Sequence, residues 1–234
     1  LHRSRRGQAP GRAGDQVHAG LVVGETDRLS DGSNHTMRDQ LNFENRNEFP
    51  AFLNECGLVG TGAEIGVLKG VFSEHILRTW KGSTLFSIDA WRNFNVDEYV
   101  DINNRSNDEQ TLYYAKTTLR LRSFGDRSIV WRMTSEQATI IIPDNTLDFC
   151  YIDADHSYDS VKNDLDIWLP KIKINGIICG HDYIEDGLHY DKNDGKLIGD
   201  FGVQKAVKEF AARDNWDVYV TESEDYPSWF AFKS

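Results

Sequence analysis

The sequence predicts a doubly wound α/β fold, in which a mostly parallel sheet carries helices on both faces. Three observations lead to this prediction. Short apolar runs alternate with helix-like segments from Glu48 onward, the central runs are apolar at nearly every position, and the last two runs form an antiparallel pair. Runs of that composition are typical of strands that are buried on both faces. A single domain of this kind accommodates the 234 residues.

The first half of the chain supplies three strand-to-helix units. A helix from Arg38 to about Cys56 is expected ahead of them. Period-two and apolar patterns predict the strands, and apolar residues at helical spacing predict the helices. The strands are expected at 63–67, 84–89 and 128–133, and the helices at 72–80, at 107–124 and after Ser135.

The second half completes a seven-stranded sheet that ends in a reversed strand. A fourth strand ends at Asp153 and a fifth near Gly180, and Pro170 ends the helix between them. On that helix we expect a solvated face made of Asp159, Lys162, Asp164 and Asp166. The remaining elements are expected to be a helix at 158–169, a polar loop at 184–201, a helix at 202–213, and closing antiparallel strands at 216–221 and 228–233.

Composition limits the partners and the compartment. The net charge of −11 disfavours nucleic acid, because phosphate neutralisation needs a basic face. The three cysteines are an odd number, which favours free thiols in a reducing compartment such as the cytoplasm. The longest apolar runs are about six residues, too short to span a membrane. Residues 1–36 are expected to be a disordered or non-native extension, or alternatively a transit peptide or basic arm, with the domain at 37–234.

Two polar clusters follow the fourth and fifth strands. The first is Asp153-Ala154-Asp155-His156-Ser157-Tyr158, and the second is Gly180-His181-Asp182-Tyr183. Because the carboxyl ends of neighbouring parallel strands meet in one crevice, we expect the clusters to lie together. The combination suits a divalent metal and a general base, for which His156 is the candidate. The alternative for His156 is a polar loop residue.

A glycine turn follows the first strand. Gly66 and Gly70 allow a ligand to approach the backbone, and the next helix offers free N–H groups. Asp89 ends the second strand, where such folds place an acid for ribose hydroxyls. The spacing E-x-G-x-x-x-G differs from the dinucleotide pattern and speaks against NAD.

These residues resemble class I S-adenosylmethionine-dependent methyltransferases over about residues 45–234. The likeness rests on Glu64-Ile65-Gly66, on Ser87-Ile88-Asp89-Ala90-Trp91, on Met133-Thr134-Ser135-Glu136, and on the closing hairpin. The resemblance implies a Rossmann-like sheet and S-adenosyl-L-methionine as cofactor. It also implies contacts from Glu64 and Gly66 to the amino-acid half, from Asp89 to ribose, and from Met133 and Ser135 to adenine, with Gly70 as a further cofactor-binding residue.

Within that family the two polar clusters resemble metal-dependent O-methyltransferases, most of all those that methylate macrolide sugars. The resemblance implies Asp153, His181 and Asp182 as ligands of Mg²⁺ or Mn²⁺, and His156 as the catalytic base. His181 departs from the family, which carries a carboxylate there, and imidazole suits Mn²⁺, Fe²⁺ or Zn²⁺ better than Mg²⁺. Three alternatives stay open: a different metal, Asp155 in place of His181, or no metal.

The sequence therefore predicts a metal-assisted O-methyltransferase that acts on a small polyhydroxylated molecule, such as a sugar or glycoside. Polar segments at 92–110 and 184–201 are expected to select the acceptor. The competing hypotheses are a catalytically silent cofactor-binding module and, less favoured, an NAD-linked oxidoreductase. Related enzymes often form homo-oligomers, but no feature of this chain indicates self-association.

Overall fold

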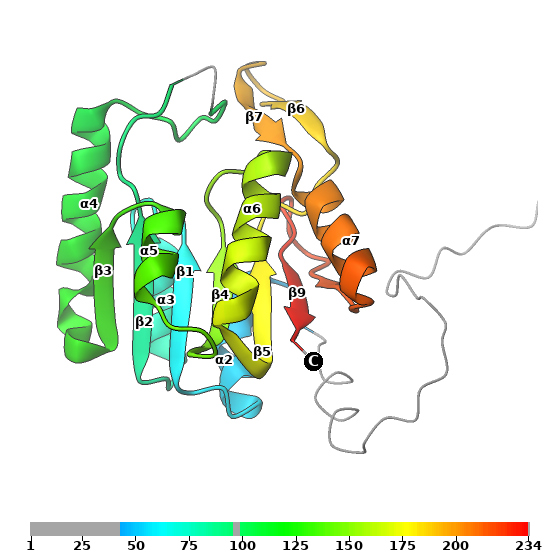
Figure 1. Cartoon of the computed structure of the whole chain (residues 1–234). Helices are drawn as coiled ribbons and strands as arrows, with labels where there is room; N and C mark the ends of the chain where they lie inside the picture. Colours follow the sequence, from blue (N-terminus) through cyan, green and yellow to red (C-terminus); the bar gives the residue numbers. More distant parts are fainter. Residues whose placement is uncertain (1–42, 96–98, 234) are drawn as a thin grey trace, which may run out of the picture.

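A seven-stranded sheet runs through the centre of the molecule in the order β3-β2-β1-β4-β5-β9-β8 (Figure 1). The computed structural model describes residues 43–95 and 99–233, so the predicted extension at 1–36 lies outside the described residues. The strands are β1 (Thr61–Ile65), β2 (Thr84–Asp89), β3 (Ser128–Arg132), β4 (Leu147–Ile152), β5 (Ile172–Gly180), β8 (Tyr219–Val220) and β9 (Trp229–Phe232).

The pairing of the strands confirms the predicted mostly parallel sheet. Strands β3, β2, β1, β4 and β5 pair in parallel, whereas β9 is antiparallel to both β5 and β8. Ile65 lies beside both Ile88 and Ile152, and Ile152 lies beside Gly180. The parallel strands therefore end together, and the polar residues that follow them share one edge of the sheet.

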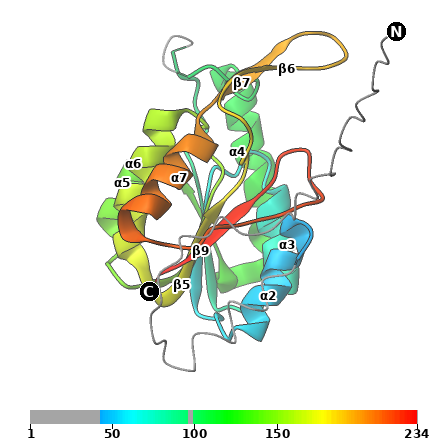
Figure 2. The ribbon, with the colours of Figure 1, turned by 90° about the vertical axis from the view of Figure 1, so that its right-hand side faces the viewer.

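Helices cover both faces of the sheet (Figure 2). One face packs against α5 (Ser135–Ile141), α6 (Tyr158–Trp168) and α7 (Val203–Asp214) through residues such as Val161, Trp168 and Val207. The other packs against α2 (Phe49–Glu55), α3 (Val71–Thr79) and the end of α4 (Asn107–Leu121). Short 3-10 helices span Arg46–Glu48 (η1), Arg122–Arg127 (η2) and Leu169–Lys171 (η3). Among the helices of the described ranges, none combines the length and apolarity that crossing a membrane requires.

The segment 184–201, predicted as a loop, forms a second small sheet instead. Strands β6 (Gly187–Tyr190) and β7 (Leu197–Phe201) make an antiparallel hairpin that projects beyond the carboxyl edge of the main sheet (Figures 1 and 2). A bridge between Asp101 and Gly199 ties it to the segment after β2. The strands are only four and five residues long, so the apolar residues in them, such as Leu188 and Phe201, form no continuous run that indicates a strand by hydropathy alone.

Two predicted elements are shorter than expected. The first α-helix begins at Phe49 rather than Arg38, because Pro50 belongs in a first helical turn and η1 precedes it. The start of that prediction lies outside the described residues. The penultimate strand covers Tyr219–Val220 rather than 216–221, since it pairs with only two residues of β9.

Candidate active site at the carboxyl edge of the sheet

A cavity of about 640 Å³ opens at the carboxyl edge, above β1, β2 and β4. It is lined by predicted site residues from both halves of the chain: Glu64, Gly66, Asp89, Met133, Ser135, Asp153 and His156. The structure thus brings the glycine turn and the first polar cluster together. Gly70 does not line the cavity.

The turn after β1 is held closed by Asp89. Gly66 has φ +85°, and a Cβ there would lie 2.0 Å from the carbonyl oxygen of Asp153, so a side chain is excluded. The backbone N–H groups of Val67 and Leu68 both donate to Asp89 Oδ2 at 2.9 Å. Asp89 therefore fixes the turn from the neighbouring strand while it also faces the cavity.

Gly70 has a structural task at the start of α3. It adopts φ +70° as the N-cap of that helix, and a Cβ would approach the side chain of Thr117 to 2.8 Å. Its lack of a side chain lets α3 and α4 pack closely. A contact from Gly70 to the cofactor stays a prediction.

Glu64 lies in the floor of the cavity and is 2 % exposed. Its carboxyl accepts a hydrogen bond from Ser73 Oγ, which in turn accepts one from Ser87 Oγ at 3.0 Å. Burial raises the pKa of Glu64 to about 8, because the charged form loses its hydration and the Ser73 hydrogen bond recovers only part of that loss. Without a bound cation, Glu64 is therefore largely neutral at pH 7.

The predicted adenine end is built from α5 and α6. Ser135 Oγ donates to Asp164 Oδ1 and accepts a hydrogen bond from Trp168 Nε1 at 2.8 Å. The prediction of a solvated Asp164 is wrong: the residue is 4 % exposed, and burial raises the pKa of its carboxyl to about 7. The helical spacing of Val161, Asp164 and Trp168 was the available signal, since it places the acid on the inner face.

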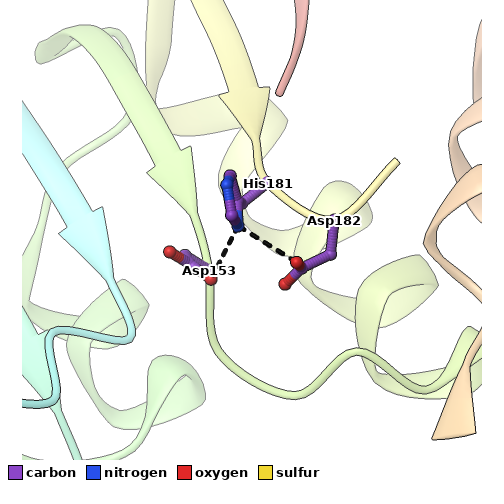
Figure 3. A group of neighbouring side chains, drawn as sticks. All are labelled: Asp153, His181 and Asp182. Atoms are coloured by element: carbon purple, nitrogen blue, oxygen red, sulfur yellow. Dashed lines mark ion pairs between the residues drawn. The ribbon is translucent and has the colours of Figure 1, made fainter. Parts of the chain in front are cut away.

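A second group of side chains gathers where β4 and β5 end (Figure 3). His181 Nδ1 lies 3.1 Å from Asp182 Oδ1 and 3.8 Å from Asp153 Oδ1. One potential ligand atom from each of Asp153, His181 and Asp182 lies within 4.8 Å of the other two. Asp182 adopts φ +57°, a left-handed conformation that is uncommon for residues with a side chain but that Asp adopts more readily than most.

The donor set of this group fits a divalent cation. Two carboxylates and one imidazole converge, which suits Mn²⁺, Fe²⁺ or Zn²⁺ and is compatible with Mg²⁺ through the oxygens. Burial favours the neutral forms of His181 and Asp182, but neighbouring charges outweigh it. Asp182 and Asp153 raise the pKa of His181, while His156 first and His181 second lower the pKa of Asp182. Asp155 is not one of these three residues, and its carboxylate accepts hydrogen bonds from Ser157 N and Ser160 Oγ.

His156 lies beside this group, between strand β7 and the segment that follows β2. Its ring stacks on Phe201 of β7 with centroids 5.0 Å apart and planes within 4°. Its Nδ1 lies 3.0 Å from Asp101 Oδ2, which orients the ring. Its buried Nε2 lies 2.8 Å from Asp182 Oδ2 and 3.7 Å from Asp153 Oδ1, without the alignment of a hydrogen bond. His156 is therefore a well-fixed imidazole whose Nε2 faces the group of Figure 3.

The charge state of His156 follows from its neighbours. Burial alone would lower the pKa of the ring, but Asp182, Asp101 and Asp153 outweigh burial and raise the pKa well above its usual range. In the protein without a cation, the imidazole thus carries the positive charge that balances the carboxylates.

Two residues of the site had no signal in the sequence. Arg46, in η1, places Nη1 3.2 Å from Asp153 Oδ2 and lines the cavity. Asp101, whose side chain is 2 % exposed, reaches His156 from the segment after β2. Neither belongs to a local motif, and each comes to the site only through tertiary packing.

Comparisons with known proteins identify the family and the fold of this chain. A family model described as a methyltransferase domain matches residues 63–183, which is 121 of the 234 residues. No curated protein matches the chain. Among solved structures, a putative caffeoyl-CoA O-methyltransferase from Staphylococcus aureus has a TM-score of 0.57 at 14 % identity, over 86 % of this chain and 93 % of that one.

Two further structures are similar in fold. A putative O-methyltransferase from Klebsiella pneumoniae has a TM-score of 0.52 at 15 % identity, over 86 % of each chain. A Burkholderia thailandensis 1,6-didemethyltoxoflavin-N1-methyltransferase with bound S-adenosylhomocysteine has a TM-score of 0.51 at 12 % identity, over 86 % of this chain and 83 % of that one. At these identities the likeness concerns the fold alone.

Proposed function

The chain belongs to the methyltransferase-domain family, and we propose that it transfers a methyl group from S-adenosylmethionine to a hydroxyl oxygen of a small polyhydroxylated molecule, such as a sugar or glycoside. We further propose that a divalent cation at Asp153, His181 and Asp182 assists the transfer. The observation that carries the proposal is the meeting of a nucleoside-sized cavity with a carboxylate–imidazole group at one edge of the sheet.

The cavity supports the cofactor assignment. Asp89 stands at the end of β2, where an acid accepts hydrogen bonds from ribose hydroxyls. The acidic floor at Glu64 suits the positive charge of the methionine half, and Met133 and Ser135 border the adenine end. S-adenosylmethionine supplies a methyl group on a positively charged sulfur, which departs as a neutral thioether.

The group around His181 supports the choice of an oxygen acceptor. A hydroxyl is a weak nucleophile until its proton is removed or its oxygen binds a metal. A divalent cation held there would lower the pKa of a bound hydroxyl and offset the carboxylates around His156. Two hydroxyls on adjacent carbons can chelate such an ion, which favours a sugar-like acceptor.

His156 is the proposed base. When its Nε2 is unprotonated, it can accept the proton of the hydroxyl as the oxygen–methyl bond forms and the sulfur–methyl bond breaks. Asp101, on the opposite ring nitrogen, keeps Nε2 directed to the site. The face of Phe201 shields the ring from water.

A paired test separates cofactor binding from chemistry. Thermal unfolding is followed with S-adenosylhomocysteine, with and without Mg²⁺ or Mn²⁺, and stabilisation should follow mass action. Product formation from S-adenosylmethionine is then measured with a panel of sugars and glycosides. His156→Ala should lower turnover by at least about 100-fold, while the binding of S-adenosylhomocysteine should stay as in the wild type.

His189→Ala is the matched control, because this half-buried histidine also contacts the Phe201 ring, but its Nε2–H donates to the Glu185 carbonyl oxygen at 2.6 Å and the residue does not line the cavity. It should leave turnover within a few-fold of the wild type. Absence of any S-adenosylhomocysteine effect on unfolding would refute the proposal. Binding without transfer across the panel would instead indicate the silent cofactor-binding module.

A further inference from the structure

We infer that Arg46 binds the carboxylate of the methionine half of S-adenosylmethionine, so that the site distinguishes the cofactor from analogues without that group. The inference rests on the proposed function, because it assigns a ligand to one end of the proposed cofactor. Arg46 lies in η1, ahead of the segment 63–183 that the family model covers.

Arg46 lies at the end of the cavity where β1 and β4 finish. It lines the cavity together with Glu64, Gly66 and Asp153. Its Nη1 is 3.2 Å from Asp153 Oδ2, and its guanidinium carbon is 4.9 Å from the centroid of the Phe72 ring. The position of the guanidinium is therefore defined by an ion pair and by a ring beneath it.

The backbone of η1 is also fixed. The N–H group of Arg46 donates to Glu224 Oε2 at 3.1 Å, and Glu224 accepts a second hydrogen bond from Thr221 Oγ1 at 2.7 Å. These contacts join the start of the domain to the turn before β9. The backbone that carries Arg46 is thus already held in place. Less conformational entropy is therefore lost when the side chain binds a ligand.

At the end of the cavity that holds Glu64 and Asp153, a bound carboxylate would need a positively charged partner. The methionine half of the cofactor carries an ammonium group, a carboxylate and the nearby sulfonium. Glu64 and Asp153 suit the two positive groups, but they repel the carboxylate. A carboxylate in a partly buried pocket needs a charged donor, and the planar guanidinium can offer two parallel N–H groups to it.

Besides His156, whose ring is held by Asp101, two other cationic side chains line the cavity, and each lies against an aromatic ring. Lys69 Nζ lies 4.7 Å from the ring centroid of Tyr113 on α4. The guanidinium of Arg92, in the segment after β2, lies 4.5 Å from the ring centroid of Phe94. The second of these is on the side of Asp89, the proposed ribose ligand. Arg46 instead contacts Asp153, at the end of the cavity where β1 and β4 finish.

The test compares two ligands that differ only in the carboxylate. Dissociation constants for S-adenosylhomocysteine and for its decarboxylated analogue are measured by calorimetry in the wild type, Arg46→Gln and Arg46→Lys. The wild type should prefer S-adenosylhomocysteine by about 10- to 100-fold, as expected for charge-assisted hydrogen bonds. Arg46→Gln should bring that ratio close to one by weakening only the carboxylated ligand, and Arg46→Lys should fall between.

Arg120→Gln serves as the control, since Arg120 pairs with Glu74 at 2.7 Å on the surface and does not line the cavity. It should keep the wild-type ratio. If Arg46→Gln weakened both ligands equally, or neither, the inference would be overturned while the proposed function stood. If the wild type bound neither ligand, the proposed function would fail first. Arg46→Lys keeps the comparison available should Arg46→Gln not fold.

Discussion

Glu64 gives the protein a pH-dependent stability at the scale of one side chain. Its pKa is about 8 in the folded protein, because burial disfavours the charge, against 4.5 for the usual carboxyl. The folded state therefore holds this proton more tightly, and the resulting stability is full below about pH 4.5 and is lost as the pH rises through 8. At about 1.4 kcal/mol per pKa unit, the effect is on the order of 4–5 kcal/mol.

We expect Glu64→Gln to remove that dependence. The free energy of unfolding is measured by denaturant at several pH values between 5 and 9. As the pH rises, it should fall for the wild type relative to the variant. Glu55→Gln, the same change on the exposed side of α2, is the control and should track the wild type. Parallel curves for Glu64→Gln and the wild type would contradict the assignment.

A substitution at Gly66 tests whether the close approach of the turn after β1 to Asp153, the residue that follows β4, matters for stability. In Gly66→Ala, the new methyl group would meet the Asp153 carbonyl and the residue would need φ +85°. We expect a loss of about 2–4 kcal/mol in unfolding free energy, by analogy with overpacked or strained positions, together with loss of S-adenosylhomocysteine binding.

Gly125→Ala separates strain from crowding. Gly125 also has a positive φ, +57°, but nothing lies within 4 Å of its added Cβ. Only the backbone cost should appear in this variant, roughly 1–3 kcal/mol for a residue with a side chain held at φ +57° and ψ −135°. Equal losses in the two variants would mean that the contact with Asp153 is unimportant.

Individual residues were predictable where a motif or a strand end marked them. Asp153, His156, His181 and Asp182 follow apolar strands directly, so their convergence was implied by the parallel sheet. Arg46 was not predictable, because a 3-10 helix more than 100 residues away from Asp153 carries no pattern that links the two. Their contact depends on packing that sequence spacing does not encode.

At the scale of elements, α4 supports the cavity wall from a well-capped start. The Ser106 side chain accepts from Glu109 N, while Glu109 reaches back to Ser106. Further along the helix, Thr117 Oγ1 donates to the Leu68 carbonyl at 3.1 Å, and Gln110 lines the cavity. The cap thus stabilises an element that contacts the turn after β1.

Ser106→Ala should therefore lower the unfolding free energy by about 1 kcal/mol, the usual value of an N-cap side chain. Chemical denaturation monitored by circular dichroism measures this. Thr118→Ala, on the exposed face of the same helix, removes a hydroxyl that bonds only within the helix, to Tyr114 O. That control should stay within about 0.5 kcal/mol of the wild type.

The β6–β7 hairpin shows which elements hydropathy reveals and which it does not. Central strands such as β4, buried at all six positions, could be placed within a residue or two. In β6 the residues alternate between partly buried and exposed, whereas β7 buries Gly199 and Phe201, and the bridge to Asp101 depends on a segment nearly 100 residues away. Its existence follows from tertiary pairing rather than from its own composition.

At the scale of the whole molecule, chemical modification of the three buried cysteines can measure whether the fold opens as one unit. Cys150 and Cys179 are inaccessible in β4 and β5, and Cys56 is 9 % exposed at the end of α2. Burial raises the pKa of Cys56 to about 11 and raises those of the other two well above the usual value, so little thiolate forms in the folded state.

We expect a thiol reagent to modify Cys56 first, and Cys150 and Cys179 only when the whole sheet opens. S-adenosylhomocysteine should slow the modification of the two strand cysteines in proportion to the stability that it adds. Mass spectrometry of the labelled peptides over time measures the order. Early labelling of Cys179 would show that β5 opens on its own.

Asp153 couples the two halves of the proposed reaction through its two oxygens. Oδ1 faces His181 at 3.8 Å, while Oδ2 faces Arg46 at 3.2 Å. A substitution of Asp153 would disturb the methyl-donor end and the acceptor end together. We therefore expect few substitutions to be tolerated at this position. Within the part of the chain that the structure describes, the β6–β7 hairpin reaches His156 through the Phe201 ring and Asp101 through the bridge from Gly199. New acceptor preferences are therefore more accessible to evolution through that hairpin than through the strand ends.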